Sequence, residues 1–338
     1  MDYKNRCFSK ATFTLFLFKQ KTCIKTGNKN RKINTYSFVL QESDHKIVGF
    51  IIFASMFNLA NLITGSNMLC GFIAIVLALA GRIDIAPLFI FLGAVLDFFD
   101  GFVARKIGVS GAMGKQLDSL ADVITFGVAP GVIMLVMIVL GIDNSSLFPA
   151  EDTTRVYQND LTYYTYFQVS AWMQALVYNV PNNFDASIKF LPFVAMIIPF
   201  LSMFRLAKFN IDERQTDRFH GLPTPLNTMF FMFFPLYFSL NVDNWAHQGK
   251  FIHLIFDCYT IAGITVVMSL MMITDIPLIA LKFKNFSWKD NKFRYLLVGK
   301  SLIIILIFQL WAIPIIVILY MILSIIDNYT TKKYEVQS

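Results

Sequence analysis

The chain is poor in charged residues and in cysteine. Only 15% of its 338 residues are charged and 56% are hydrophobic, whereas about a quarter of an ordinary soluble domain is charged. This composition excludes a soluble globular protein. The four cysteines are scattered and share no metal-ligand spacing, so they support no argument beyond packing. No internal repeat, Walker loop or dinucleotide-binding glycine pattern is present, and we expect no nucleic-acid partner.

Long apolar runs are what the chain has instead. Each covers about 18 to 25 residues with almost no charge, which is long enough for a helix to cross a hydrocarbon layer of roughly 30 Å. The runs are continuous rather than alternating, which favours helices over barrel strands. We predict an all-α, polytopic transmembrane helical bundle with six core spans and one or two C-terminal membrane segments. The expected spans are 60–80, 86–104, 119–140, 191–208, 223–240, 254–281 and 300–325. Pro314 divides the last run, which is either one kinked span or a shallow hairpin.

Basic residues gather in alternate connections. They cluster in residues 105–115, 205–218 and 282–294, and they are sparse in the connections between these clusters. Because cytoplasmic loops of membrane proteins collect Lys and Arg, we expect the three basic connections and the amino terminus on the cytoplasmic side. The side on which the carboxyl terminus lies stays open.

Composition also divides the chain into regions. Residues 1–48 hold ten bases and three acids, and their net charge of +7 equals that of the whole chain. This extension is either a basic arm for anionic lipid or a disordered segment, and its low hydrophobic periodicity favours disorder. We expect a membrane domain at 49–281 with an extracytoplasmic insertion at 141–190. A cytoplasmic loop, a C-terminal membrane segment and a tail would follow at 282–338.

Four aspartates lie in one of the most apolar parts of the chain. Asp97 and Asp100 share one stripe of the second expected span, and Asp118 and Asp122 share one stripe of the next helix. A short connection, residues 106–113, lets the two helices turn back on each other, so the four carboxylates can converge. Small residues and one base lie on the same stripes: Gly101, Ala104, Arg105 and Gly114.

Four carboxylates at short range in a low-dielectric region repel one another, and each intramembrane acid costs at least about 2.5 kcal/mol. Arg105 and Lys106 cannot neutralise four charges. Two divalent cations can, and such ions suit phosphoryl chemistry because they bridge phosphate oxygens. The alternative, that some acids are solvated or paired with nearby bases, is weaker for four acids on two matched stripes. A divalent-cation transporter is a remote alternative, since it would be expected to hold its acids near mid-bilayer, in broken helices.

The complete pattern, D-x-x-D-G-x-x-A-R-x8-G-x3-D-x3-D, runs from Asp97 to Asp122 and resembles the signature of the CDP-alcohol phosphatidyltransferases. The resemblance implies a membrane enzyme that transfers a phosphatidyl group from a CDP-linked lipid to an alcohol and releases CMP. It implies that two Mg²⁺ or Mn²⁺ ions bind the first three aspartates, and that the last one lies at the edge of this metal site as the base. The metal ligands would be Asp97, Asp100 and Asp118 with Asp122 beside them, and the CDP-lipid would contact Gly101, Ala104, Arg105 and Gly114.

The stretches "GKQLDSLADVITFGVAP", "FRLAKFNI" and "FHGLPTP" resemble those of bacterial family members that use serine. This resemblance implies CDP-diacylglycerol and L-serine as substrates and a location in the inner, cytoplasmic membrane, with the active site facing the cytoplasm. Phosphatidylglycerophosphate synthesis, or transfer to another alcohol, is the alternative. Arg205 and Lys208 are candidates for binding the serine carboxylate, and ordinary membrane anchoring explains each of them equally well. The sequence leaves the oligomeric state open, a homodimer included.

Polar side chains recur along one side of the first expected span, at Asn58, Asn61, Thr64 and Asn67. Hydrogen bonding between helices is one explanation. Recognition of the cytosine or ribose of the CDP-lipid is the other. The two explanations are balanced for Asn61 and Thr64, and packing is favoured for Asn58 and Asn67.

Overall fold

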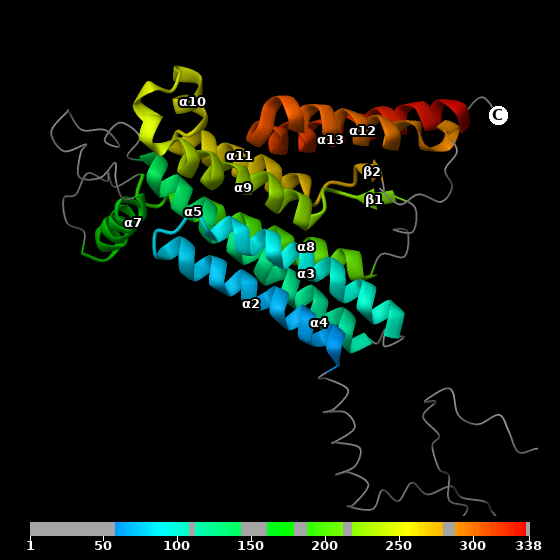
Figure 1. Cartoon of the computed structure of the whole chain (residues 1–338), viewed down its shortest axis with the longest axis horizontal. Coiled ribbons are helices and arrows are strands. Elements are labelled where there is room, and N and C mark those ends of the chain that lie inside the picture. The colour runs from blue at the N-terminus through cyan, green and yellow to red at the C-terminus, as the bar shows by residue number, and fades with distance from the viewer. Residues whose placement is uncertain are drawn as a thin grey trace, which may run out of the picture. The chain divides into compact units, whose positions relative to one another are not determined.

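The computed structural model describes residues 58–107, 112–142, 161–178, 188–211, 218–279 and 288–335. From Leu59 onward the chain forms one compact unit, whose elements are labelled in Figure 1. The basic extension expected at residues 1–48 lies outside the described residues.

The described chain begins with the helices that carry the aspartates. α2 spans Leu59–Leu79 and α3 spans Ala86–Ile107. A continuous helical run follows, composed of α4 (Ala112–Val123), a single π-helical segment η1 (Ile124–Val128) and α5 (Ala129–Ile142). This run starts seven residues before the expected third span, so that Asp118 and Asp122 belong to the same helical rod as the apolar α5.

The remaining elements continue in chain order. They are α7 (Leu161–Tyr178), η2 (Leu191–Met196), α8 (Ile197–Ile211), β1 (Arg218–His220), α9 (Thr224–Asn241), η3 (Val242–His247), α10 (Lys250–Ile255), α11 (Cys258–Met271), β2 (Pro277–Ile279), α12 (Trp288–Phe308), η4 (Gln309–Trp311) and α13 (Ala312–Glu335). β1 and β2 pair antiparallel, with Phe219 opposite Leu278. This short ribbon joins the chain after α8 to the chain after α11.

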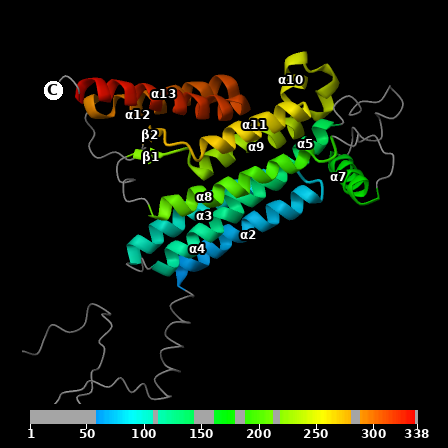
Figure 2. The ribbon, with the colours of Figure 1, turned by 180° about the vertical axis from the view of Figure 1, so that it is seen from behind.

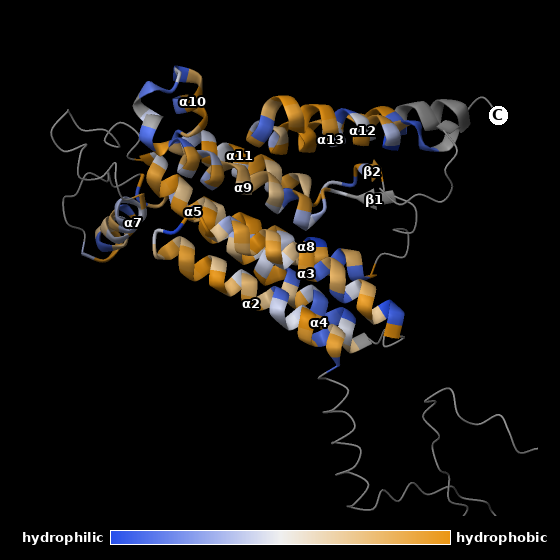
Figure 3. Ribbon diagram, in the orientation of Figure 1, coloured by the Kyte–Doolittle hydropathy of each residue, from blue (hydrophilic) through white to orange (hydrophobic). Residues whose placement is uncertain are grey.

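Five helical segments of the described residues are long and apolar enough to cross a membrane: Leu59–Leu79, Ala86–Ile107, Met113–Ile142, Leu191–Ile211 and Asn291–Asn328. Figure 3 shows hydrophobic residues along most of the bundle. The all-α, multi-pass membrane bundle predicted from the sequence is therefore confirmed.

The expected sixth span is shorter than its apolar run. α11 starts at Cys258 because the Asp257 carboxylate caps it, with Oδ2 accepting hydrogen bonds from the backbone N–H groups of Tyr259 and Thr260. It ends at Met271, ten residues before the expected end, and the chain then enters β2 at Pro277. The apolar pattern alone could not locate this end, because strand β2 is as hydrophobic as the helix before it.

α5 lies at the centre of the bundle. It packs against α2, α7, α9 and α11, and every residue from 129 to 141 except Val132 is buried. A helix that is hydrophobic on all sides is expected inside a bundle rather than on its surface. The central rod therefore fixes where α4, which continues into it, presents its aspartates.

α7 packs against α5 at the end of the bundle where α2 turns into α3. Gly81 forms this turn with a φ of +87°, and a Cβ there would lie 2.2 Å from the carbonyl oxygen of Thr162. The aspartates lie near the opposite end of α3. Residues 161–178 are thus remote from the carboxylates.

The last apolar run forms a hairpin. α12 and α13 pack against each other, and both views show them side by side (Figures 1 and 2). The chain reverses at η4, where Gln309 has a φ of +48°, five residues before Pro314. Of the two alternatives left by the sequence, the hairpin is correct, and each arm is longer than half of the apolar run.

Candidate active site

The four aspartates meet where the end of α3 passes α4. One carboxylate oxygen from each of Asp97, Asp100 and Asp118 lies within 4.8 Å of the others. The Asp97 carboxyl group is also close enough to form hydrogen bonds with those of Asp118 and Asp122. Asp100 is buried and Asp97 and Asp118 are half-buried. The two stripes recognised in the sequence therefore converge.

No basic side chain in the described ranges forms an ion pair with these carboxylates; the ion pairs found there are Arg82–Asp84 and Lys208–Asp275. Arg105, which belongs to the aspartate pattern, is exposed and donates instead from Nε to the carbonyl oxygen of Gly101 at 2.9 Å. Oxygen-only donors whose negative charge is not neutralised by ion pairs suit hard divalent cations. The residues present thus fit a metal site.

α2 covers the cluster and contacts two of the acids. Thr64 Oγ1 donates to Oδ2 of Asp100 at 2.5 Å, and Asn67 Nδ2 donates to Oδ1 of Asp122 at 3.5 Å. Asn61 faces α4, where its Oδ1 would lie 3.5 Å from a Cβ on Gly114. The sequence favoured a packing role for Asn67. The structure shows that its amide also contacts one of the four aspartates, Asp122.

The π-helical segment η1 begins two residues after Asp122. Within it, Thr125 Oγ1 donates to the carbonyl oxygen of Asn67 at 3.0 Å, while Thr228 Oγ1 of α9 donates to that of Phe126 at 2.8 Å. A π-helical turn within an α-helix frequently marks a functional site. Sequence reasoning missed Thr125 because a threonine in an apolar span does not reveal which helix it contacts.

The stripe of small residues borders open space. A Cβ on Gly101 would meet no atom within 4 Å, and Gly101 and Arg105 are exposed while Ala104 is half-buried. This side of α3 therefore leaves room for a bulky group next to the carboxylates.

Arg205 and Lys208, one turn apart on α8, have different surroundings. Arg205 is buried, lies 5.1 Å from the ring centroid of Phe209, and interacts electrostatically with Asp122 and with Tyr320 of α13. Lys208 forms a 2.5 Å ion pair with Asp275, which lies between α11 and β2. Of the two bases, Arg205 is the one with a described link to the aspartates. Tyr320 was missed because it lies in the C-terminal segment, far from any motif.

The three stretches that resemble serine-using family members, GKQLDSLADVITFGVAP, FRLAKFNI and FHGLPTP, also hold parts of the bundle together. Asn210 Nδ2 donates to Ser119 Oγ at 2.6 Å, and Lys115 Nζ donates to the carbonyl oxygen of Asn210 at 3.2 Å, which ties α8 to α4. Gly221, with a φ of +78°, donates to the carbonyl oxygen of Ile276. A Cβ at this glycine would lie 2.4 Å from the carbonyl oxygen of Met272, so the loop needs glycine at this position.

Comparison with known proteins agrees with this geometry. Residues 57–149, which contain the whole aspartate pattern, match the sequence model of the CDP-alcohol phosphatidyltransferase family. The CDP-diacylglycerol–serine O-phosphatidyltransferase of Bacillus subtilis (strain 168) is 33% identical over 172 residues, which cover 50% of this chain and 70% of the relative. The chain belongs to the CDP-alcohol phosphatidyltransferase family.

Other relatives of this phosphatidyltransferase carry related names. The CDP-diacylglycerol–serine O-phosphatidyltransferase of Helicobacter pylori (strain J99) is 26% identical over 270 residues, 79% of this chain and 89% of the relative. The archaetidylserine synthase of Methanothermobacter thermautotrophicus is 38% identical over 95 residues, 27% of this chain and 38% of the relative. The likeness to the Helicobacter protein therefore extends well beyond the aspartate pattern.

Proposed function

We propose that this protein transfers a phosphatidyl group from CDP-diacylglycerol to L-serine, giving phosphatidylserine and CMP. The observation that carries the proposal is the convergence of the family's aspartates from α3 and α4, with three carboxylate oxygens within 4.8 Å of one another. The acceptor is inferred from the relatives, which are named for serine in bacteria and for archaetidylserine in an archaeon.

In this proposal Asp97, Asp100 and Asp118 hold two divalent ions, Mg²⁺ or Mn²⁺. When bound, these ions neutralise the carboxylates and stabilise negative charge that develops on the diphosphate. The open side of α3 receives the CDP-lipid, with Gly101 and Ala104 allowing close approach. The other proposed contacts to this lipid are Arg105, Gly114, Asn61 and Thr64.

The proposed reaction is a substitution at the phosphorus that bears diacylglycerol. Asp122 takes the proton from the serine hydroxyl, the new oxygen–phosphorus bond forms, and the bond to CMP breaks. Asp122 is suited to this role because the Asn67 amide holds its carboxylate and Arg205 interacts with it electrostatically. Arg205 binds the serine carboxylate. Lys208 contributes positive charge nearby, reduced by its ion pair with Asp275.

We further propose that the protein lies in the inner, cytoplasmic membrane with its aspartates facing the cytoplasm. The basic connections between alternate helices support this orientation. In a cysteine-free variant, a cysteine at Lys106 should react with an impermeant thiol reagent only after the inner face is opened. A cysteine at Arg82, in the opposite turn, should react in intact cells. The reverse pattern would overturn the orientation.

An acceptor screen tests the proposed function. The purified full chain in nanodiscs would receive CDP-diacylglycerol and one labelled acceptor at a time: L-serine, glycerol 3-phosphate or inositol phosphate. We expect CMP release and labelled lipid with serine. Transfer to glycerol 3-phosphate alone would instead identify a phosphatidylglycerophosphate synthase.

Asparagine variants test the metal site. Asp97→Asn, Asp100→Asn or Asp118→Asn keeps the side-chain size and removes one charge, so each should abolish transfer while the protein still enters the membrane. Asp84→Asn is the matched control, because Asp84 pairs with Arg82 in the turn at the other end of α3. Transfer that persists in a strong chelator would disprove the metal-dependent mechanism.

A further inference from the structure

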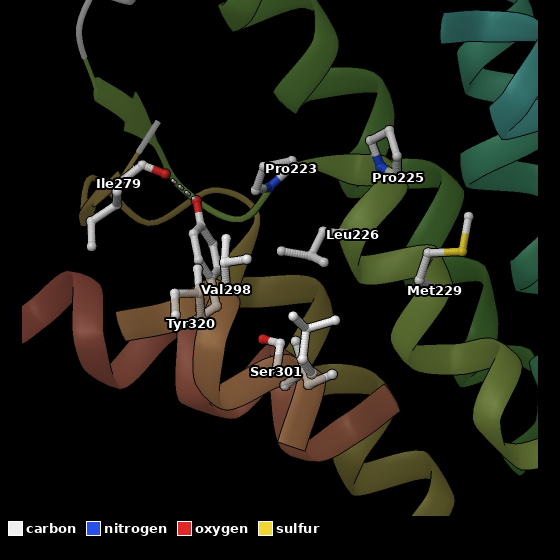
Figure 4. Close-up of a pocket in the computed structure, with 11 residues that line it drawn as sticks. Pro223, Pro225, Leu226, Met229, Ile279, Val298, Ser301 and Tyr320 are labelled. Carbon is white, nitrogen blue, oxygen red and sulfur yellow. Dashed lines mark hydrogen bonds between the residues drawn. The ribbon is translucent and has the colours of Figure 1, made fainter. Parts of the chain in front are cut away.

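A cavity of about 530 Å³ lies between the start of α9, strand β2 and the C-terminal hairpin (Figure 4). Pockets that bind small molecules typically have volumes of about 300–1,000 Å³. Its wall is almost entirely apolar. The lining residues are Pro223, Pro225, Leu226, Met229, Ile279 and, from the hairpin, Leu297, Val298, Ser301, Leu302, Ile316 and Tyr320.

The cavity has a buried floor and an open rim. Leu297, Ile279 and Tyr320 are buried, whereas Val298 and Leu302 on α12 are exposed. Tyr320 Oη donates to the carbonyl oxygen of Ile279 at 3.0 Å, so its polar atom is satisfied and its ring adds apolar wall. The opening is therefore lateral, through the surface of the hairpin.

The surroundings indicate what enters such an opening. α12 and α13 belong to an apolar segment, Asn291–Asn328, that meets the criteria for crossing a membrane. An apolar opening in the side of such a segment suits the hydrocarbon of lipids better than water. A flexible acyl chain can fill it and gains roughly 0.8 kcal/mol for each CH₂ that it buries.

The floor of the cavity is also linked to the reaction centre. α9, whose first residues line the cavity, packs against α3, which carries Asp97 and Asp100, and against α13. A lipid whose diphosphate lies at the aspartates can therefore extend a tail along α9 towards the hairpin. Other lipids of the membrane lack the CDP headgroup, so they are not anchored at the aspartates.

We propose that this cavity binds one acyl chain of CDP-diacylglycerol, so that the C-terminal hairpin takes part in recognising the donor lipid. This inference rests on the proposed function and adds a binding site outside the family-matched residues 57–149. The hairpin then selects donors by the length of their chains.

Filling the cavity tests the proposal through chain length. Ser301→Trp should raise the KM for dioleoyl CDP-glycerol about tenfold, because displacing a few methylenes from the cavity costs enough binding free energy for this change. The KM for the dihexanoyl donor should change less than twofold. Leu306→Trp is the matched control, because Leu306 is exposed on the same helix and does not line the cavity. Equal KM changes for both donors would overturn the proposal.

Photolabelling tests the proposed acyl-chain site without requiring turnover. CDP-diacylglycerol with a diazirine at the end of one acyl chain should label residues 297–302 of the wild-type chain, and Ser301→Trp should remove this labelling. Excess unlabelled dioleoyl CDP-glycerol should compete, whereas excess phosphatidylglycerol should not. Labelling elsewhere, or equal competition by both lipids, would overturn the cavity assignment. Failure of the proposed function would differ, because serine would then not be used with either donor.

Discussion

The hydroxyl of Thr64 on α2 donates a 2.5 Å hydrogen bond to Oδ2 of Asp100 on α3. The competing acceptor, the carbonyl oxygen of Ala60, lies 3.1 Å from the same hydroxyl. Thr64 is buried, so water cannot readily replace it. A side chain that orients a metal-binding carboxylate influences how strongly the metal is held.

Thr64→Val removes this donor and keeps the side-chain shape. The Mn²⁺ concentration for half-maximal transfer should rise about 10- to 100-fold, while Thr64→Ser should restore it. Ser66→Ala is the control, because the Ser66 hydroxyl bonds the carbonyl oxygen of Leu62 on the exposed side of the same helix. An unchanged Mn²⁺ dependence in Thr64→Val would show that the hydrogen bond does not support the metal site.

Asp122→Asn distinguishes the proposed base from the proposed metal ligands. A positioned general base contributes about 10²- to 10⁴-fold to a rate, so the variant should lose at least about a hundredfold in serine transfer. Binding of Mn²⁺ and of CDP-diacylglycerol, measured at equilibrium, should be retained. Loss of Mn²⁺ binding as complete as in Asp118→Asn would identify Asp122 as a fourth ligand.

Arg205→Lys should weaken serine binding. A lysine keeps the charge but cannot offer the paired donors that a guanidinium presents to a carboxylate. We expect the KM for serine to rise about tenfold, with the KM for CDP-diacylglycerol changed less than twofold. Lys208→Gln should have a smaller effect on serine KM, since Asp275 already binds Lys208. The opposite order would assign the serine carboxylate to Lys208.

Gly93→Ala probes the contact between α3 and the π-helical segment. Its Cβ would lie 2.7 Å from Thr125 Cγ2 and 2.9 Å from Asn67 Oδ1, and such overpacking typically costs about 1–3 kcal/mol. Thermal unfolding in detergent should therefore occur at a lower temperature. Gly263→Ala on α11 is the control, because its Cβ would meet nothing within 4 Å and alanine favours helix by up to about 1 kcal/mol.

Much of the fold could be predicted from the lengths of the apolar runs in the sequence. The first two spans end within a few residues of the structure's helices, because charged residues or glycine flank them. α11 is shorter than the apolar run in which it lies. Its first residue is set by the Asp257 cap, and the apolar strand β2 follows its end. Pro314 suggested where the last run bends, but the chain reverses earlier at Gln309, a residue type that gives no turn signal.

The candidate site could also be predicted only in part. Asp97, Asp100, Asp118 and Asp122 could be found from helical spacing, because each pair repeats at three or four residues. The partners of these acids could not, since their contacts join α2 to α3 and α4 across large separations in sequence. Lys208 looked equivalent to Arg205 by spacing, and its pairing with Asp275 depends on how α8 packs beside the end of α11.

The reversal at Gln309 also determines where a reporter fused to this enzyme would reside. Because α12 and α13 run back along each other, the start of α12 and the end of α13 are at the same end of the pair. Residue 288 lies within the basic connection 282–294, for which we propose the cytoplasmic side. The end of α13 would then lie on that side as well. A fluorescent protein attached after residue 338 should therefore mature in the cytoplasm, whereas alkaline phosphatase at the same junction should stay inactive.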